Sequence, residues 1–337
     1  MIENLFRSTV LALLLFDQSA IWGRADETTP ISKESCPQQI TKALAKEIVT
    51  RGQVDFSDLD PMSIMFTPNY LKFFIDHMFH VLAALETGYK NHASLTFGVS
   101  IASTAIVFHK PMHQGDDFEI RARIIRLGTE SITVHLQMGN ADRGIVSECE
   151  IVLVCVNKGT LESMPWPEQF KNQLLSAAPH GPFEKWQKNE KHPKSDRSTQ
   201  GNVKEFVTRS SVRYSHLDPL NHTMFTPIYV KFFINHLFKA FAALGADYTS
   251  YASMPFAIAM AQLEALFYSP MKPNDDFEIR SKVVRFGTKS LTVHLQMFSA
   301  DKIVAESELV LVCMDKNDLV SVPWPKRFAE FFRPCCR

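Results

Sequence analysis

The chain has 337 residues, of which 45% are hydrophobic and 21% charged, and its formal net charge is zero. This length suits two domains of ordinary size, and the composition is that of a globular protein rather than a disordered or collagen-like one. The neutral charge argues against nucleic acid as the main partner, because phosphate binding requires a basic surface.

The first 25 residues differ in character from the rest of the chain. The short apolar run "STVLALLLF" is followed by small residues in "GRA", just before Asp26. This pattern resembles a secretory signal peptide, and the apolar run is shorter than a transmembrane helix normally requires. The sequence therefore predicts export or membrane association through residues 1–25. The alternative is a cytoplasmic protein with an apolar extension.

The remainder of the chain contains a duplication. The segment "DDFEIRARIIRLGTESITVHLQM" begins at Asp116, and "DDFEIRSKVVRFGTKSLTVHLQM" begins at Asp275. The match extends in both directions, to "MFTPNYLKFF" against "MFTPIYVKFF" and to "PWPEQF" against "PWPKRF". The period is far too long for a solenoid, so each copy is expected to be a whole domain.

Each copy predicts the same order of elements. A short strand comes first ("GQVDF" or "SSVRY"), followed by a loop and a long apolar helix. Thr67-Pro68 and Thr226-Pro227 mark the helix starts, because Thr is a good cap and Pro is favoured at the first helical position. Gly88 and Gly245 mark the expected ends. In the first copy, strands are predicted at 97–108, 117–127, 131–138 and 145–156, with alternation typical of an antiparallel sheet.

A long helix followed by an antiparallel sheet that wraps it predicts the hot-dog fold. We expect an α+β double hot-dog, with domains at 48–170 and 203–333 whose sheets join edge to edge. The polar residues 171–202 are predicted to link the domains. Further assembly into a homo-oligomer of double hot-dogs is a possible outcome.

The loop before the first helix carries the candidate chemistry. "VDFSDLDPMSIMFTPNYLKFF" contains Asp60-Pro61, a short loop, and Pro-Asn-Tyr inside the helix. A helix start presents unpaired N–H groups and a positive dipole end, which suits a developing oxyanion. A carboxylate beside that point can attack the carbonyl or activate water. The alternative is that Asp60-Pro61 has only a structural role and begins a turn.

This segment closely resembles the active-site segment of the 4-hydroxybenzoyl-CoA thioesterase family. The resemblance implies hydrolysis of an acyl-CoA or acyl-carrier-protein thioester, without a metal or other cofactor. It implies that Asp60 is the catalytic carboxylate and that the backbone N–H of Thr67 is the oxyanion donor. Tyr70, at the family's spacing from the Asp, is expected to contribute to substrate binding.

The second copy, "VRYSHLDPLNHTMFTPIYVKFF", carries the counterparts in a loop that is one residue longer. Asp218 matches Asp60, and His222 is a candidate base near neutral pH. The expected substrate-binding residues of this copy are Asn221, Thr226 and Tyr229. Because the extra residue is expected to displace Asp218, the sequence predicts that Asp60 carries more of the hydrolysis.

Other polar residues are interpreted as structural. His77 and His236 are predicted to be core histidines of the helices, and His135 and His294 are predicted to face solvent or the other copy. Cys155 and Cys313 lie in apolar runs and are expected to be buried free thiols. No CxxC or Cys/His zinc spacing occurs in the sequence, so no metal site is predicted.

Two rival functions remain open at this point. One is a hot-dog enoyl-thioester hydratase or dehydratase, which "LDPLNH" faintly resembles. The other is an acyl-binding protein that keeps the fold without catalysis. Release of free thiol from an acyl thioester separates hydrolysis from both.

Overall fold

A computed structural model describes residues 48–84, 95–177, 206–219, 222–243 and 256–332. Several predictions fall outside these residues and stay predictions: the signal segment 1–25, the helix ends at Gly88 and Gly245, Asn221, and residues 178–202 of the linker. In these described ranges, no helix has both the length and the apolar character that a membrane crossing requires.

The two halves repeat one order of elements. The first half contains β1 (Val49–Gln53), η2 (Phe56–Asp58), α3 (Thr67–Ala84), β2 (Gly98–Phe108), β3 (Asp117–Leu127), β4 (Ser131–Asn140), β5 (Gly144–Val156) and α4 (Glu168–Ala177). The second half contains β6 (Phe206–Ser211), η4 (Tyr214–His216), α5 (Thr226–Ala243), β7 (Phe256–Phe267), β8 (Asp276–Phe286), β9 (Ser290–Ser299), β10 (Lys302–Asp315) and α7 (Lys326–Phe332).

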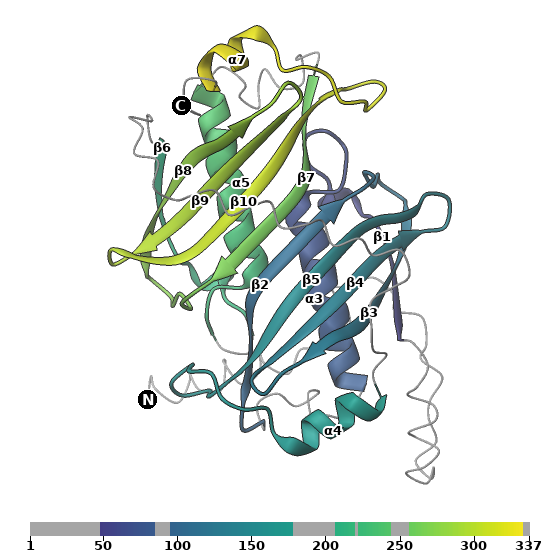
Figure 1. The fold of residues 1–337 in the computed structure, drawn as a ribbon, viewed down its shortest axis with the longest axis vertical. Coiled ribbons are helices and arrows are strands. Elements are labelled where there is room, and N and C mark those ends of the chain that lie inside the picture. The colour runs from purple at the N-terminus through teal and green to yellow at the C-terminus, as the bar shows by residue number, and fades with distance from the viewer. Residues whose placement is uncertain (1–47, 85–94, 178–205, 220–221, 244–255, 333–337) are drawn as a thin grey trace, which may run out of the picture. The chain divides into compact units, whose positions relative to one another are not determined.

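The strands form one ten-stranded sheet in the order β1-β3-β4-β5-β2-β7-β10-β9-β8-β6, and neighbouring strands pair antiparallel. The halves join where β2 pairs with β7, and this pairing is symmetric about Ala105 and Glu264, which are counterparts of each other. Helices α3 and α5 lie on the same face of the sheet (Figure 1). The predicted α+β double hot-dog with edge-to-edge sheets is confirmed.

The core lies between each long helix and the concave face of its half of the sheet. Phe74 of α3 and Phe233 of α5 are completely buried, and so are Leu136 and Leu295 in the matching strands. Alternate residues of β4 and β9 point into this core, as the two-residue period requires. Each large apolar side chain buried in this way contributes roughly 1.5–3 kcal/mol to folding.

Two predicted boundaries need correction. The first strand of each half lies earlier than expected, at 49–53 and 206–211, because its pairing with β3 or β8 ends before the buried Val54 or Val212. Helix α4 continues to Ala177, inside the segment predicted as a linker. Its Phe170 and Leu174 are buried in the core, so the first domain extends beyond residue 170.

The core cysteines match their prediction, but His135 does not, whereas the side chain of its counterpart His294 is 23% exposed. Cys155 and Cys313 are buried free thiols. His135, however, is fully buried rather than exposed, with its Nε2 3.6 Å from the Glu148 carboxylate. Burial raises the pKa of Glu148, but hydrogen bonds from His109, His135 and Gln137 outweigh it and lower this pKa to about 2. The outer face of the sheet therefore carries a polar cluster that the alternation of the strand alone did not reveal.

The helix histidines are core residues, as predicted. His77 Nδ1 lies 2.7 Å from Thr50 Oγ1, and His236 Nδ1 lies 2.8 Å from Thr208 Oγ1, so each histidine fastens the edge strand to its helix. His236 Nε2 also bonds Ser281 Oγ at 2.8 Å. Among the described residues, His77 Nε2 has no hydrogen-bond partner, because Ala122 stands where the second half has Ser281.

Replacing Ala122 by Ser is expected to stabilise the protein by about 1 kcal/mol, because the new hydroxyl can pair with the buried Nε2 of His77. Denaturant unfolding of wild type and A122S measures the difference. The corresponding variant of the second half, Ser281→Ala, should lower the free energy of unfolding by a similar amount, because it leaves His236 Nε2 without the Ser281 hydroxyl. An A122S protein less stable than wild type would show that the site has no room for the hydroxyl.

Candidate active site

Both Asp-Pro loops are held to the protein by the same backbone contacts. Leu59 bridges Met65, and the Asp60 N–H donates to the Ile64 carbonyl at 2.8 Å. In the second half, Leu217 bridges Met224, and the Asp218 N–H donates to the Thr223 carbonyl at 2.8 Å. Each aspartate therefore starts from an equivalent backbone position at the base of its loop.

In the sequence, the extra residue of the second loop lies between Pro219 and His222. Ser63 and His222 occupy matching places just before the loop closes, with positive φ angles of 61° and 54°. Residues with this backbone geometry reverse the chain, and glycine is the residue that adopts it most easily. The Asp218 N–H keeps the backbone contact that the Asp60 N–H makes, and the expected displacement of the Asp218 carboxylate stays a prediction.

The two carboxylates have different surroundings. Asp60 Oδ1 accepts hydrogen bonds from the N–H groups of Met62 at 2.7 Å and Ile64 at 3.4 Å. Burial nevertheless raises the pKa of Asp60 to about 6, against these two hydrogen bonds. Asp218 Oδ2 accepts from the N–H of Thr223 at 3.3 Å and from its hydroxyl at 2.9 Å. The Thr223 hydroxyl is a contact that the first loop lacks, since Ile64 takes its place.

Among the residues that the structure describes, one backbone N–H is left at the beginning of α5. The N–H of Phe225 donates to the His216 carbonyl, Pro227 has no N–H, and the N–H of Ile228 donates to the Phe225 carbonyl. Among the first described groups of this helix, the Thr226 N–H is therefore the one placed to bind an oxyanion. In the first half, the N–H of Phe66 donates to the Asp58 carbonyl, Pro68 has no N–H, and the N–H of Asn69 donates to the Phe66 carbonyl. The Thr67 N–H is therefore the corresponding donor at the start of α3.

The predicted substrate-binding tyrosines are buried. The hydroxyl of Tyr229 accepts the Met271 N–H at 3.1 Å, and that of Tyr70 accepts the N–H of Met112. Burial raises the pKa of both phenols, so they stay protonated. Each tyrosine fastens its helix to the chain that leaves β2 or β7, and this anchoring also shapes the site.

A cavity of about 490 Å³ opens beside Asp218. The second half supplies the Asp-Pro loop, the start of α5 and the end of β7 to its wall, including Thr223, Thr226, Tyr229, Phe267 and Tyr268. The first half supplies α3, β2 and β5, including Ile75, Asp76, Phe79, Val99, Ile101 and Val156. The volume is that of a small-molecule site, and the wall is largely apolar with a few polar groups, as in most ligand pockets.

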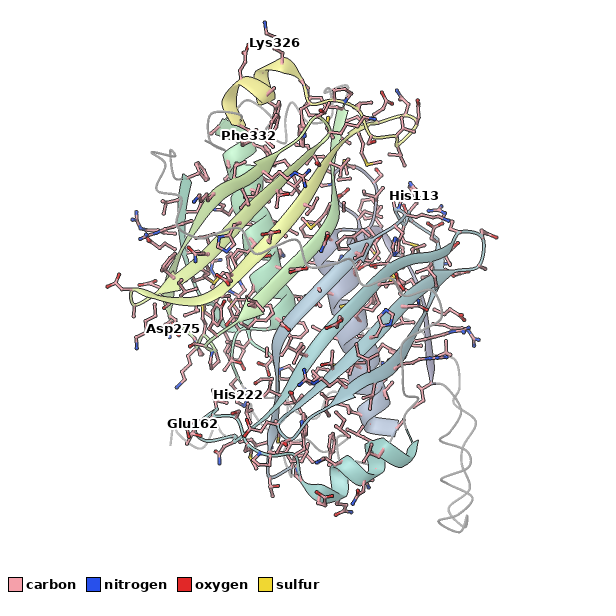
Figure 2. All side chains as sticks on the ribbon, in the orientation of Figure 1. His113, Glu162, His222, Asp275, Lys326 and Phe332 are labelled. Carbon is pink, nitrogen blue, oxygen red and sulfur yellow. The ribbon has the colours of Figure 1, made fainter. Side chains whose placement is uncertain are left out.

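The cavity belongs to both halves. It lies where the β2–β7 pairing has ended, beyond Ser103 and Leu266, and it continues to Leu161 and Ser163 of the first half. Leu161 and Ser163, which follow β5, line the same cavity as Asp218 and Thr223, and Figure 2 labels Glu162 and His222 beside this part of the chain. A single hot-dog domain could not form this wall.

The structure brings together only some of the predicted residues. Asp218, Thr226 and Tyr229 line the same cavity. His222 is exposed and does not line it. Asp60, Thr67 and Tyr70 form the equivalent arrangement at the start of α3, on the other side of the pseudo-twofold axis.

The cavity residues that were not singled out from the sequence include Asp76, Thr223 and Tyr268. The signal available for them was a difference between the copies, because their counterparts are Asn235, Ile64 and His109. Tyr268 is further distinguished by its hydroxyl, which donates to Glu306, a buried carboxylate that also bonds Gln296.

The fold is shared with solved thioesterase structures. A protein described as an oleoyl thioesterase from Lactobacillus plantarum aligns with a TM-score of 0.65 at 10% identity, over 83% of this chain and 98% of that one. An acyl-ACP thioesterase from Bacteroides thetaiotaomicron aligns with a TM-score of 0.61 at 10% identity, over 80% of this chain and 99% of its own. The 12:0-ACP thioesterase from Umbellularia californica gives 0.60 at 10% identity, over 79% and 94%.

A search of curated protein sequences found no match to the chain. A family model, however, matches it twice, over residues 54–174 and 212–332, which are the two halves of the double hot-dog. Together these matches cover well over half of the sequence. The chain belongs to the thioesterase-like superfamily.

Proposed function

We propose that this protein hydrolyses an acyl thioester in the cavity beside Asp218. The observation that carries the proposal is the coincidence of three features on one cavity wall: the Asp218 carboxylate, the start of α5 with its Thr226 N–H, and an apolar lining. Membership in the thioesterase-like superfamily supports the hydrolase class.

In the proposed mode of binding, the thioester carbonyl oxygen lies at the Thr226 N–H. The positive end of the helix dipole adds to this donor as charge develops on the oxygen. The acyl chain lies against the apolar wall that Ile75, Val99 and Ile101 provide. Asp218, one of whose oxygens is held by Thr223, is beside the carbonyl carbon, where it can attack or take a proton from water.

The substrate class is an acyl-CoA or an acyl-carrier-protein thioester. The Bacteroides and Umbellularia proteins that share the fold are named as acyl-ACP thioesterases, which supports testing carrier-protein substrates beside CoA esters. The volume of about 490 Å³ favours an acyl group much larger than acetyl.

The test is a panel of acyl-CoA and acyl-carrier-protein esters of increasing chain length, with free thiol followed by a thiol-reactive dye. We expect saturable thiol release by the wild-type protein. Hydration of a 2-enoyl ester without thiol release would instead favour the hydratase alternative. Tight binding with neither reaction would favour an acyl-binding protein.

A further inference from the structure

The cavity beside Asp218 contains a second carboxylate, and it comes from the other half of the chain. Asp76 is in the middle of α3, on the same wall as Ile75 and Phe79. Its side chain is 46% exposed, so it is open to the cavity and to water. Asp76 and Asp218 therefore face one small volume from opposite halves of the double hot-dog.

Both carboxylates are oriented by neighbours on their own element. Lys72 Nζ lies 3.3 Å from Asp76 Oδ2, one helical turn away, and this pair directs the carboxylate along the surface of α3. Asp218 is held through Oδ2 by the N–H and hydroxyl of Thr223. Because Asp218 belongs to the loop that precedes the Thr226 N–H, it is the carboxylate placed beside a carbonyl bound at that donor.

We propose that the two carboxylates divide the reaction, with Asp218 as the nucleophile and Asp76 as the base that activates water. This inference rests on the proposed hydrolase function. It adds Asp76 as a catalytic residue, so that each half of the chain contributes one carboxylate to the active site.

The chemistry takes place in two balanced steps. Asp218 attacks the thioester carbonyl carbon, the C–S bond breaks, and the leaving thiolate takes a proton from solvent. The product of this step is a mixed anhydride between the acyl group and Asp218. A water molecule then attacks the acyl carbon while Asp76 takes its proton, the anhydride C–O bond breaks, and the Asp218 carboxylate is regenerated. The proton on Asp76 returns to solvent, and the net reaction is thioester plus water to acid plus thiol.

The duplication makes this division specific to one site. The residue of α5 that corresponds to Asp76 is Asn235, and an amide cannot take a proton from water. The counterparts of Ile101 and Val156 are Met260 and Met314, which are longer side chains for the equivalent wall. The Asp60 loop therefore lacks the second carboxylate, even though it has a carboxylate and a helix start of its own.

The test is pre-steady-state thiol release by the Asp76→Asn variant of the full chain. We expect a burst of about one thiol per chain, as in wild type, followed by steady-state turnover slowed by about a hundredfold, because general-base assistance is typically of this size. Hydroxylamine, which needs no base to attack an anhydride, should restore turnover of this variant and produce the hydroxamate. Asp218→Asn should give no burst and should not be rescued.

The matched control is Asn235→Asp, the mirror change in the other half, which should leave the burst and the turnover unchanged. Circular dichroism and binding of a non-hydrolysable acyl-CoA thioether check that each variant is folded and binds ligand. Asp76→Asn with wild-type turnover, or with slow turnover and no burst, would overturn the division of roles. Wild-type protein that releases no thiol at all would instead overturn the proposed function itself.

Discussion

Replacing Asp218 by Asn is expected to lower kcat for acyl-thioester hydrolysis by about a hundredfold or more, while Asp60→Asn leaves it close to wild type. The amide has nearly the same shape as the carboxylate but can neither attack the carbonyl nor accept a proton. Asp218 lines the cavity that combines an apolar wall with the Thr226 N–H, so its loss removes the reacting group. Steady-state kinetics at saturating acyl-CoA measures both variants.

The two substitutions control for each other, because the loops share their backbone contacts. This expectation reverses the one drawn from loop length, in which Asp60 was the stronger site. Burial raises the pKa of Asp60 to about 6, so the pH dependence of hydrolysis can also show whether Asp60 takes part. If Asp60 were the working base, hydrolysis would fall as the pH falls through about 6. Loss of turnover in Asp60→Asn, with Asp218→Asn near wild type, would place the reaction in the first loop.

A steep loss of stability at mildly acidic pH is expected from His77 and His236. Burial lowers the pKa of His77 to about 3 and that of His236 to about 4, with smaller effects from His80 and Lys239. In the unfolded chain both histidines take up a proton near pH 6.5. Between pH 6.5 and about 4 the unfolded state therefore binds more protons, and the free energy of unfolding falls as the pH falls. Each histidine contributes about 1.4 kcal/mol per pH unit in this window.

The raised pKa of Asp60 has the opposite effect on the pH dependence of stability, so its contribution has to be separated from that of the histidines. Its folded-state pKa is raised, so below about pH 6 the folded state binds its proton first and gains stability as the pH falls. The difference between variants isolates one histidine. His236→Leu should reduce the pH dependence of the free energy of unfolding by about 1.4 kcal/mol per unit, whatever it does to stability at neutral pH. Urea unfolding at several pH values between 7.5 and 5 measures this slope, and an unchanged slope would mean that His236 titrates normally in the folded protein.

The fold was predictable from the sequence because it depends on repeated, local signals. Thr67-Pro68 and Thr226-Pro227 marked the helix starts, and the period-two alternation of "SITVHLQM" marked a strand with one buried face. The duplication then predicted how the two sheets would meet. The first strands were misplaced because Val54 and Val212 look like strand residues but are buried beyond the last paired position.

The candidate site was only partly predictable, because half of its cavity comes from the other copy. Asp218 and Thr226 were found from the Asp-Pro loop and the helix start, which are close in sequence. Asp76 and Ile101 come from elements of the first half, and no pattern within one copy connects them to Asp218. Loop length alone also could not show that the Asp218 N–H keeps the backbone contact made by the Asp60 N–H.

The most direct test of hydrolysis beside Asp218 is a crystal structure of the Asp218→Asn variant with an intact acyl-CoA bound. We expect the acyl chain to occupy the cavity between α3 and the end of β2. The thioester oxygen should lie within hydrogen-bonding distance of the Thr226 N–H, and the carbonyl carbon should face residues 76 and 218. An acyl chain bound at the Asp60 loop, or outside the cavity with its carbonyl away from the start of α5, would contradict it.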